Sequence, residues 1–203
     1  MVNHLGDLER LRNRYFAMRH GRSRANESGL IVSDPAAASN PAWGLTAGTE
    51  REITASVERM ALDLGREVLV ISSDFSRAVE TAVIAAALLG GGVVHRTRWL
   101  RERYFGQFDL GPDLGYRQVW DHDVEGASEQ FGSVEPADAV LSRTTRYVRL
   151  LEARFEGCTF LLVSHGDPLQ ILQTGFARLG PSAHRRLPPL RTGEIRRLRL
   201  TGD

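Results

Sequence analysis

Short apolar runs alternate with longer helical stretches along most of this chain. The runs expected to form strands are rich in β-branched or aromatic residues and span 15–18, 68–71, 93–94, 160–163 and 195–200. The stretches with apolar residues at helical spacing are 49–64, 78–89 and 136–155. Strands that alternate with helices favour a layered α/β fold. We therefore expect a three-layer α/β/α arrangement around a mixed, mostly parallel central sheet.

The length of the chain favours a single domain. Its 203 residues are enough for one hydrophobic core and few for two, so we expect one domain over 1–203. Two segments, 28–46 and 104–132, interrupt the alternation with small, polar and helix-breaking residues. Long irregular segments inside a compact domain are usually functional, so we expect substrate loops or a lid there. Trp43 and Trp120 lie in these segments and either close over a substrate or pack against the core.

Composition limits the range of partners. The formal net charge is +1, which argues against a nucleic-acid or membrane partner. The single cysteine, Cys158, excludes an intrachain disulfide framework and suits a reducing compartment. The first residues lack the apolar core of a signal peptide, and no apolar run is long enough to cross a bilayer. We expect a soluble, cytoplasmic protein, and the sequence predicts no oligomeric state.

Charged side chains follow the strand-like runs. Arg19 and His20 follow the first run, Arg77 the second and His165 the fourth, while Glu102 lies beyond the third. Ligands bind at the carboxyl ends of strands in open α/β sheets, so we expect these side chains to converge. Clustered cations repel one another, and an anion at the centre of the group would relieve that repulsion.

A phosphoryl group suits this set of side chains. The planar fork of arginine donates paired hydrogen bonds to phosphate oxygens, and a neutral histidine attacks phosphorus through one ring nitrogen. A glutamate with a raised pKa protonates the leaving oxygen. Gly21 and Gly166 each follow a histidine, and glycine allows the backbone to approach a phosphate closely. The sequence therefore predicts a centre for phosphoryl transfer.

Five blocks of sequence, in order, resemble one known family. They are Arg19-His20-Gly21 with Ser23 and Asn26, then 44–48, 72–82, 100–108, and finally 163–166 with its Ser-His-Gly. Together they resemble the histidine phosphatase superfamily, in its phosphoglycerate-mutase-like branch, over nearly the whole chain.

The resemblance implies a role for each catalytic candidate. His20 would be the nucleophile, and Arg19, Arg77 and His165 would hold the phosphoryl group. Glu102 would protonate the leaving oxygen and then deprotonate the attacking water. The resemblance implies no metal and no organic cofactor, because the arginines supply the charge that a metal ion supplies elsewhere.

The expected substrate-binding residues surround the first motif. They are Gly21, Arg22, Ser23, Asn26 and Gly166. Arg22 departs from the family pattern, which more often has an acidic or amide side chain there. Together with Arg24, it could favour a second negative group on a small phosphorylated substrate.

These residues leave three functions open. The first is metal-independent hydrolysis of a small phosphomonoester through a phosphohistidine on His20. The second is a phosphoglycerate-mutase-type transfer, which needs a closed pocket that excludes water. Such mutases generally carry a longer insertion than 104–132, which favours the phosphatase. The third is a silent phosphate-binding regulatory protein, and the intact His20 and Glu102 argue against it.

Less specific interpretations remain for several residues. Glu102 lies between Arg101 and Arg103, where an exposed ion pair is the alternative to an acid catalyst. His165 is a core histidine in the competing interpretation. The run 121–123, Asp-His-Asp, has metal-ligand residue types, but a solvated loop is the favoured interpretation because adjacent side chains diverge.

Overall fold

The computed structural model describes residues 2–202, and within that range five strands form one sheet in the order β3-β2-β4-β1-β5. The strands are β1 (Arg14–Arg19), β2 (Val68–Ser73), β3 (His95–Thr97), β4 (Thr159–Ser164) and β5 (Ile195–Leu198). The first four pair in parallel, and β5 pairs antiparallel with β1. The expected mixed, mostly parallel sheet is confirmed.

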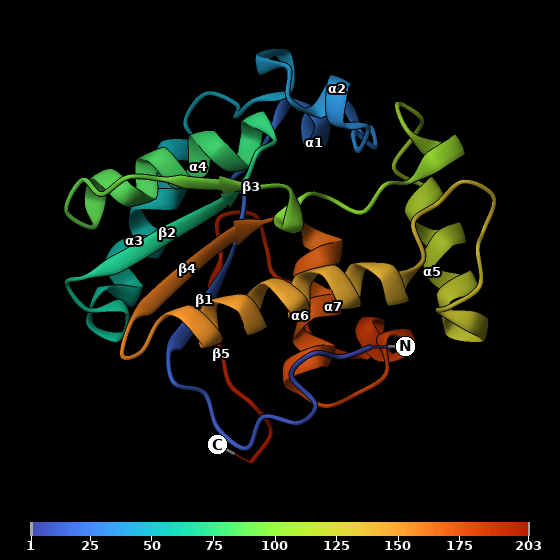
Figure 1. The fold of residues 1–203 in the computed structure, drawn as a ribbon. Helices are drawn as coiled ribbons and strands as arrows, with labels where there is room; N and C mark the ends of the chain where they lie inside the picture. Colours follow the sequence, from blue (N-terminus) through green and yellow to red (C-terminus); the bar gives the residue numbers. More distant parts are fainter. Residues whose placement is uncertain (1, 203) are drawn as a thin grey trace.

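Helices cover both faces of this sheet, as Figure 1 shows. On one face lie α3 (Thr49–Leu64) and α4 (Ser76–Leu88), and on the other lie α6 (Ala137–Arg154) and α7 (Gly166–Phe176). Successive side chains of a strand point to opposite faces. Phe16 of β1 therefore packs in the core under α3 and α4, whereas Tyr15 packs in the core under α6 and α7. The expected three-layer arrangement is confirmed.

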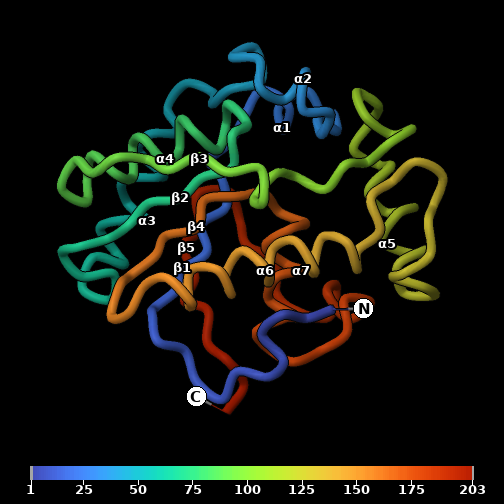
Figure 2. Tube along the Cα trace, in the orientation of Figure 1, coloured from blue at the N-terminus to red at the C-terminus, as the bar shows by residue number. Residues whose placement is uncertain are grey.

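Shorter elements complete the chain. They are α1 (Arg24–Ser28), α2 (Pro35–Ala38), α5 (Gly115–Gly126) and 3₁₀ turns at Pro41–Trp43, Arg98–Leu100, Gly106–Phe108 and Pro181–Arg186. In Figure 2 the trace beyond β3 leaves the sheet and turns into α5 at one side of the molecule. No helix within residues 2–202 is both long and apolar enough to span a membrane.

The expectation of irregular backbone throughout 104–132 was wrong, because α5 occupies 115–126. The buried face of this helix includes an aspartate, Asp123, alongside Val119. Asp123, buried in a pair with Arg103, interrupts the apolar stripe that Tyr116, Val119 and Trp120 begin, so the helical pattern is short. Likewise, 28–46 contains α2 and a 3₁₀ turn.

Two further expectations need correction. The third strand begins at His95 and not at 93–94, and Val93 is exposed. This short edge strand carries polar side chains, so an apolar run did not mark it. The helix α7 was not expected: its polar residues Asp167, Gln170, Gln173 and Thr174 recur at helical spacing, but every residue from Asp167 to Phe176 is buried, so the helix has no solvent-exposed face. Pro168 in its first turn was the available signal.

The sheet register places the motifs side by side. Arg19, the last residue of β1, lies opposite Ser164, the last residue of β4. The backbone N–H of His20 then donates to the carbonyl of Ser164 at 2.9 Å. The segments that follow β1 and β4, which carry the two histidine motifs, therefore leave the sheet together.

Candidate active site

The two motif histidines meet beyond the ends of β1 and β4. The ring centroids of His20 and His165 are 5.1 Å apart, and both side chains are buried. Arg77, in the first turn of α4, reaches the same place and donates from Nε to His20 Nε2 at 3.1 Å. The structure thus brings together residues that lie far apart in the sequence.

Hydrogen bonding fixes the tautomer of His20. Its Nδ1 lies 2.7 Å from the carbonyl oxygen of Gly21. A carbonyl only accepts, so Nδ1 carries the proton and Nε2 carries the lone pair. Burial, and then the charges of Arg77 and Arg19, hold the pKa of His20 well below its usual range. The side chain is therefore neutral, with Nε2 available as a nucleophile.

His165 is also neutral, and its bond to Ser73 indicates which ring nitrogen carries the proton. Its Nε2 lies 2.9 Å from Ser73 Oγ, and that oxygen accepts from the N–H of Phe75 at 3.3 Å. The serine proton is then free to bond to Nε2, which leaves Nδ1 as an N–H donor. Burial chiefly lowers the pKa of His165, with the charge of Arg77 next. This histidine can donate to an oxyanion without carrying a charge.

Three donors of the site have no partner among the described residues. They are Arg19 Nε, Arg77 Nη1 and His165 Nδ1, all buried. The two guanidinium groups are held by other bonds, to the carbonyls of Leu190 (3.0 Å) and Val32 (2.9 Å). A buried donor without a partner is costly, and phosphoryl oxygens are strong acceptors. This donor set fits a phosphoryl group.

Glu102 is a buried acid. It is 7% exposed, which excludes the surface ion pair considered from the sequence. Its Oε1 accepts from the backbone N–H of Arg103 at 3.0 Å. Burial raises the pKa of Glu102 to about 7; the positive charge of Arg77 opposes this rise and the negative charge of Asp167 adds to it. The carboxyl group therefore holds its proton close to neutral pH.

A cleft of about 350 Å³ opens beside these groups. Its lining includes Arg19, Asn26, Glu102, Tyr116, Trp120, Gly166, Gln170 and Arg185. The helix α5 supplies two aromatic residues of this wall, Tyr116 and Trp120, whose rings stack with centroids 5.4 Å apart. Arg185 lies over the Trp120 ring, 3.7 Å from its centroid. Trp120 therefore both packs and lines the cleft.

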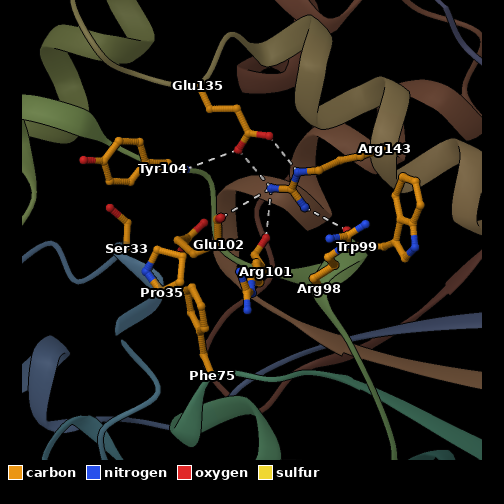
Figure 3. A pocket seen from close by; sticks show the side chains of 10 residues that line it. All are labelled: Ser33, Pro35, Phe75, Arg98, Trp99, Arg101, Glu102, Tyr104, Glu135 and Arg143. Carbon is orange, nitrogen blue, oxygen red and sulfur yellow. Dashed lines mark hydrogen bonds and ion pairs between the residues drawn. The ribbon is translucent and has the colours of Figure 1, made fainter. Parts of the chain in front are cut away.

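A second cavity, of about 470 Å³, also reaches Glu102. Figure 3 shows its lining, where Glu135 accepts from Arg143 and from the backbone N–H of Tyr104. Neither Arg19 nor Gly166 lines this cavity, whereas both line the 350 Å³ cleft. The smaller cleft is therefore the one that adjoins Arg19, one of the three unpartnered donors.

The expected substrate-binding residues divide into two groups. Asn26 and Gly166 line the cleft. Gly21, Arg22 and Ser23 line neither cavity. Arg22 is exposed and lies 3.7 Å from Glu27, so the structure does not support its expected contact with a second negative group. Ser23 instead caps α1 and bonds to Asn26.

The two glycines that follow the histidines are needed for different structural reasons. The N–H of Gly21 donates to Thr81 at 3.0 Å, and an added Cβ would lie 2.3 Å from Thr49 Cγ2. Gly21 is thus required by packing against α3, and its amide is already bonded. At Gly166 an added Cβ would lie 3.3 Å from Arg19 Cζ. The absence of a side chain there makes room for the Arg19 guanidinium.

Sequence reasoning missed several buried or cleft-lining residues. They are Ser73, Arg103, Tyr116, Asp123, Asp167 and Arg185. Arg103 was considered only as part of a charged surface, yet it is 1% exposed. The solvated-loop interpretation of 121–123 was wrong for Asp123, which is buried on a helix. No local pattern identifies these residues, because their partners come from distant segments.

A family model for the histidine phosphatase superfamily (branch 1) matches residues 15–203. The chain belongs to this superfamily. No curated protein sequence matches the chain. Among solved structures, the mycobacterial glucosyl-3-phosphoglycerate phosphatase in complex with VO3 is 21% identical, with a TM-score of 0.75 over 91% of each chain. The phosphoserine phosphatase of Entamoeba histolytica with 3-phosphoglyceric acid is 19% identical, with a TM-score of 0.73 over 90% of this chain and 88% of that one. These likenesses support the fold of a histidine phosphatase.

Proposed function

We propose that this histidine phosphatase homologue hydrolyses a small phosphomonoester, without a metal ion, through a phosphohistidine on His20. The observation that carries the proposal is the neutral His20, whose Nε2 lone pair lies among three buried donors that have no protein partner. Membership of the superfamily supports it, as do solved relatives named as phosphatases.

In the first step His20 Nε2 attacks phosphorus and the bond from phosphorus to the alcohol oxygen breaks. The bond from Arg77 to Nε2 must first open, and phosphoryl oxygens then accept from Arg77, Arg19 and His165. Glu102 gives its proton to the departing oxygen. The products of this step are the free alcohol, a phosphohistidine and a glutamate carboxylate.

In the second step Glu102 acts as a base. Its carboxylate takes a proton from water, the water oxygen bonds to phosphorus, and the bond from phosphorus to Nε2 breaks. Inorganic phosphate leaves, His20 is neutral again and Glu102 is protonated again. The raised pKa of Glu102, about 7, suits both roles, because a group that titrates near the working pH donates and accepts protons with equal ease.

The alcohol portion of the substrate would bind in the 350 Å³ cleft. The cleft begins at Arg19 and Glu102 and extends to Trp120 and Arg185. A volume at the lower end of ordinary ligand sites suits a small substrate. The phosphoryl group would lie at the donors and the alcohol along the wall formed by α5.

The direct test is turnover of p-nitrophenyl phosphate and glycerol 2-phosphate in the presence of EDTA, with wild type and His20→Ala. A phosphoenzyme formed from ³²P-labelled substrate is expected in wild type, labile in acid and stable in base as a P–N bond is. His20→Ala should lose both the label and the turnover.

The other functions predict different results. Exchange of the label into a bound phosphoglycerate, with isomerisation outpacing hydrolysis, would indicate a mutase. Binding of phosphate without turnover of any substrate would indicate a silent regulatory protein. Turnover that persists in His20→Ala would refute the proposed mechanism.

A further inference from the structure

A buried cluster of charges lies directly behind the proposed acid. Arg103, the residue after Glu102, donates to both oxygens of Asp123 at 2.6 and 2.8 Å and to Asp167 Oδ2 at 3.2 Å. A further bond joins its Nε to the carbonyl of Glu135 at 2.6 Å. All three charged side chains are 2% exposed. The guanidinium of Arg103 is thus held by four bonds in one orientation.

Asp167 belongs to this cluster and to the cleft at the same time. It lies two residues after His165, in the first turn of α7, and lines the cleft together with Glu102. Its Oδ2 accepts from Arg103, and its Oδ1 accepts from Trp120 Nε1 at 2.8 Å. One carboxylate therefore joins the second histidine motif, the segment that carries the acid, and the cleft wall on α5.

The cluster has more acid than is needed to neutralise its arginine. Two carboxylates face the Arg103 guanidinium, and a further neighbour is His184, whose Nε2 lies 3.7 Å from Asp123 and 3.8 Å from Asp167. Nδ1 of His184 bonds to the carbonyl of Pro181 at 2.8 Å. Buried ion pairs seldom add net stability, because removing charges from water is costly. Their use here is better explained by what they hold in place.

We propose that Asp167 is a positioning residue for the general acid: it fixes Arg103 and Trp120 around Glu102 and directs negative charge at the Glu102 carboxyl group. This inference rests on the proposed hydrolysis, in which Glu102 is the acid. It assigns Asp167 no contact with the reacting atoms.

Charges from several elements surround Glu102, and Arg143 of α6 donates to its backbone carbonyl at 3.3 Å. Arg77 of α4 and Arg19 of β1 favour the ionised carboxylate, and the phenol of Tyr116 on α5 is neutral. Asp167 of α7 is the neighbouring anion, and its charge adds to burial in raising the pKa of Glu102. Without the negative charge of Asp167, the positive charges of Arg77 and Arg19 would lower the pKa of Glu102 further, so Glu102 would lose its proton at lower pH.

Asp167→Asn tests this role, with Asp123→Asn as the matched control. Both variants remove one acid partner of Arg103 and leave one carboxylate to pair with it, so both leave the cluster balanced. Of these two acids, Asp167 lines the cleft together with Glu102, and its charge raises the pKa of Glu102. The measurement is kcat against pH with glycerol 2-phosphate, whose leaving group needs a proton, and with p-nitrophenyl phosphate, whose leaving group does not.

With glycerol 2-phosphate, Asp167→Asn is expected to move the alkaline fall in kcat to lower pH by roughly one unit. At pH 7.5 this corresponds to a loss of several-fold in rate, while turnover of the aryl substrate changes little. Asp123→Asn should leave the position of the alkaline fall unchanged. Trp120→Phe, which keeps the charge of Asp167, should raise KM and leave the profile in place.

Several outcomes would overturn the inference. One is an unchanged profile in Asp167→Asn; others are an equal shift in Asp123→Asn or a shift in Trp120→Phe. If Asp167→Asn does not fold, Asp167→Ser takes its place with the same expected shift, because it also removes the carboxylate. Failure of the proposed function is distinguishable, since the wild type would then lack turnover that depends on His20.

Discussion

Replacing Glu102 by glutamine should stabilise the protein at alkaline pH while it removes the proposed acid catalyst. Glutamine has nearly the shape of a protonated glutamic acid and never ionises. The wild-type carboxyl is buried, so its ionised form is disfavoured in the folded state, and its pKa rises to about 7. The unfolded chain, in which the same group is in water, loses its proton near the ordinary value of 4.5.

The size of the effect follows from these two pKa values. The folded state of the wild type binds the proton more tightly, so the free energy of unfolding falls as pH rises above about 4.5. The fall is about 1.4 kcal/mol per pH unit and levels off above the folded pKa of about 7. The full loss is about 3 kcal/mol. Glu102→Gln has no such pH-dependent loss. Its free energy of unfolding should therefore exceed that of wild type by about 3 kcal/mol at pH 8 and by under about 1 kcal/mol at pH 5.

Urea unfolding of both proteins at pH 5 and pH 8 measures this difference directly. Glu58→Gln, a change at an exposed position on α3, is the control and should give nearly the same small difference at both pH values. With glycerol 2-phosphate, kcat of Glu102→Gln should fall by about 10²–10⁴-fold, the range for loss of an acid catalyst. A stability difference for Glu102→Gln that does not grow between pH 5 and pH 8 would refute the reasoning.

Three further outcomes are expected. In wild type, kcat for an alkyl phosphate should fall as pH rises through about 7, because the pKa of Glu102 is about 7, and a pH-rate profile that stays flat to pH 9 would contradict this. Arg185→Ala should raise KM with little change in kcat in steady-state kinetics, because Arg185 lines the cleft. Arg22→Ala should change neither KM nor kcat, and a raised KM for Arg22→Ala would show that Arg22 binds substrate. Gly21→Ala should lower the free energy of unfolding by about 1–3 kcal/mol, because the added methyl meets side chains of α3, and Gly92→Ala, in open space, should be nearly neutral by urea unfolding.

Much of the fold could be predicted from the sequence because local patterns carry it. The strands β1, β2 and β4 are buried on both faces, so they read as apolar runs. The helix α3 keeps a polar face, and its predicted bounds 49–64 are those observed. The edge strand β3 was misplaced because it lacks apolar residues, and α7 was missed although its polar residues recur at helical spacing, because those residues are buried with the rest of the helix.

The sequence by itself determined which side chains form the candidate site. His20, Arg77, Glu102 and His165 follow strands or stand in motifs whose order is read along the chain, and parallel strands bring their carboxyl ends to one edge. Chemistry of this kind is local to each motif, so no knowledge of distant partners was needed to propose it.

Only the tertiary structure decided what surrounds that centre. The bond from Arg77 to His20, the burial of Glu102 and the absence of Arg22 from the cleft lining depend on how distant segments pack together. Asp167 and Arg103 look like ordinary surface charges in sequence, and their partners lie 20 or more positions away. Burial and electrostatic field depend on distance in space, and that distance is set when the whole chain packs.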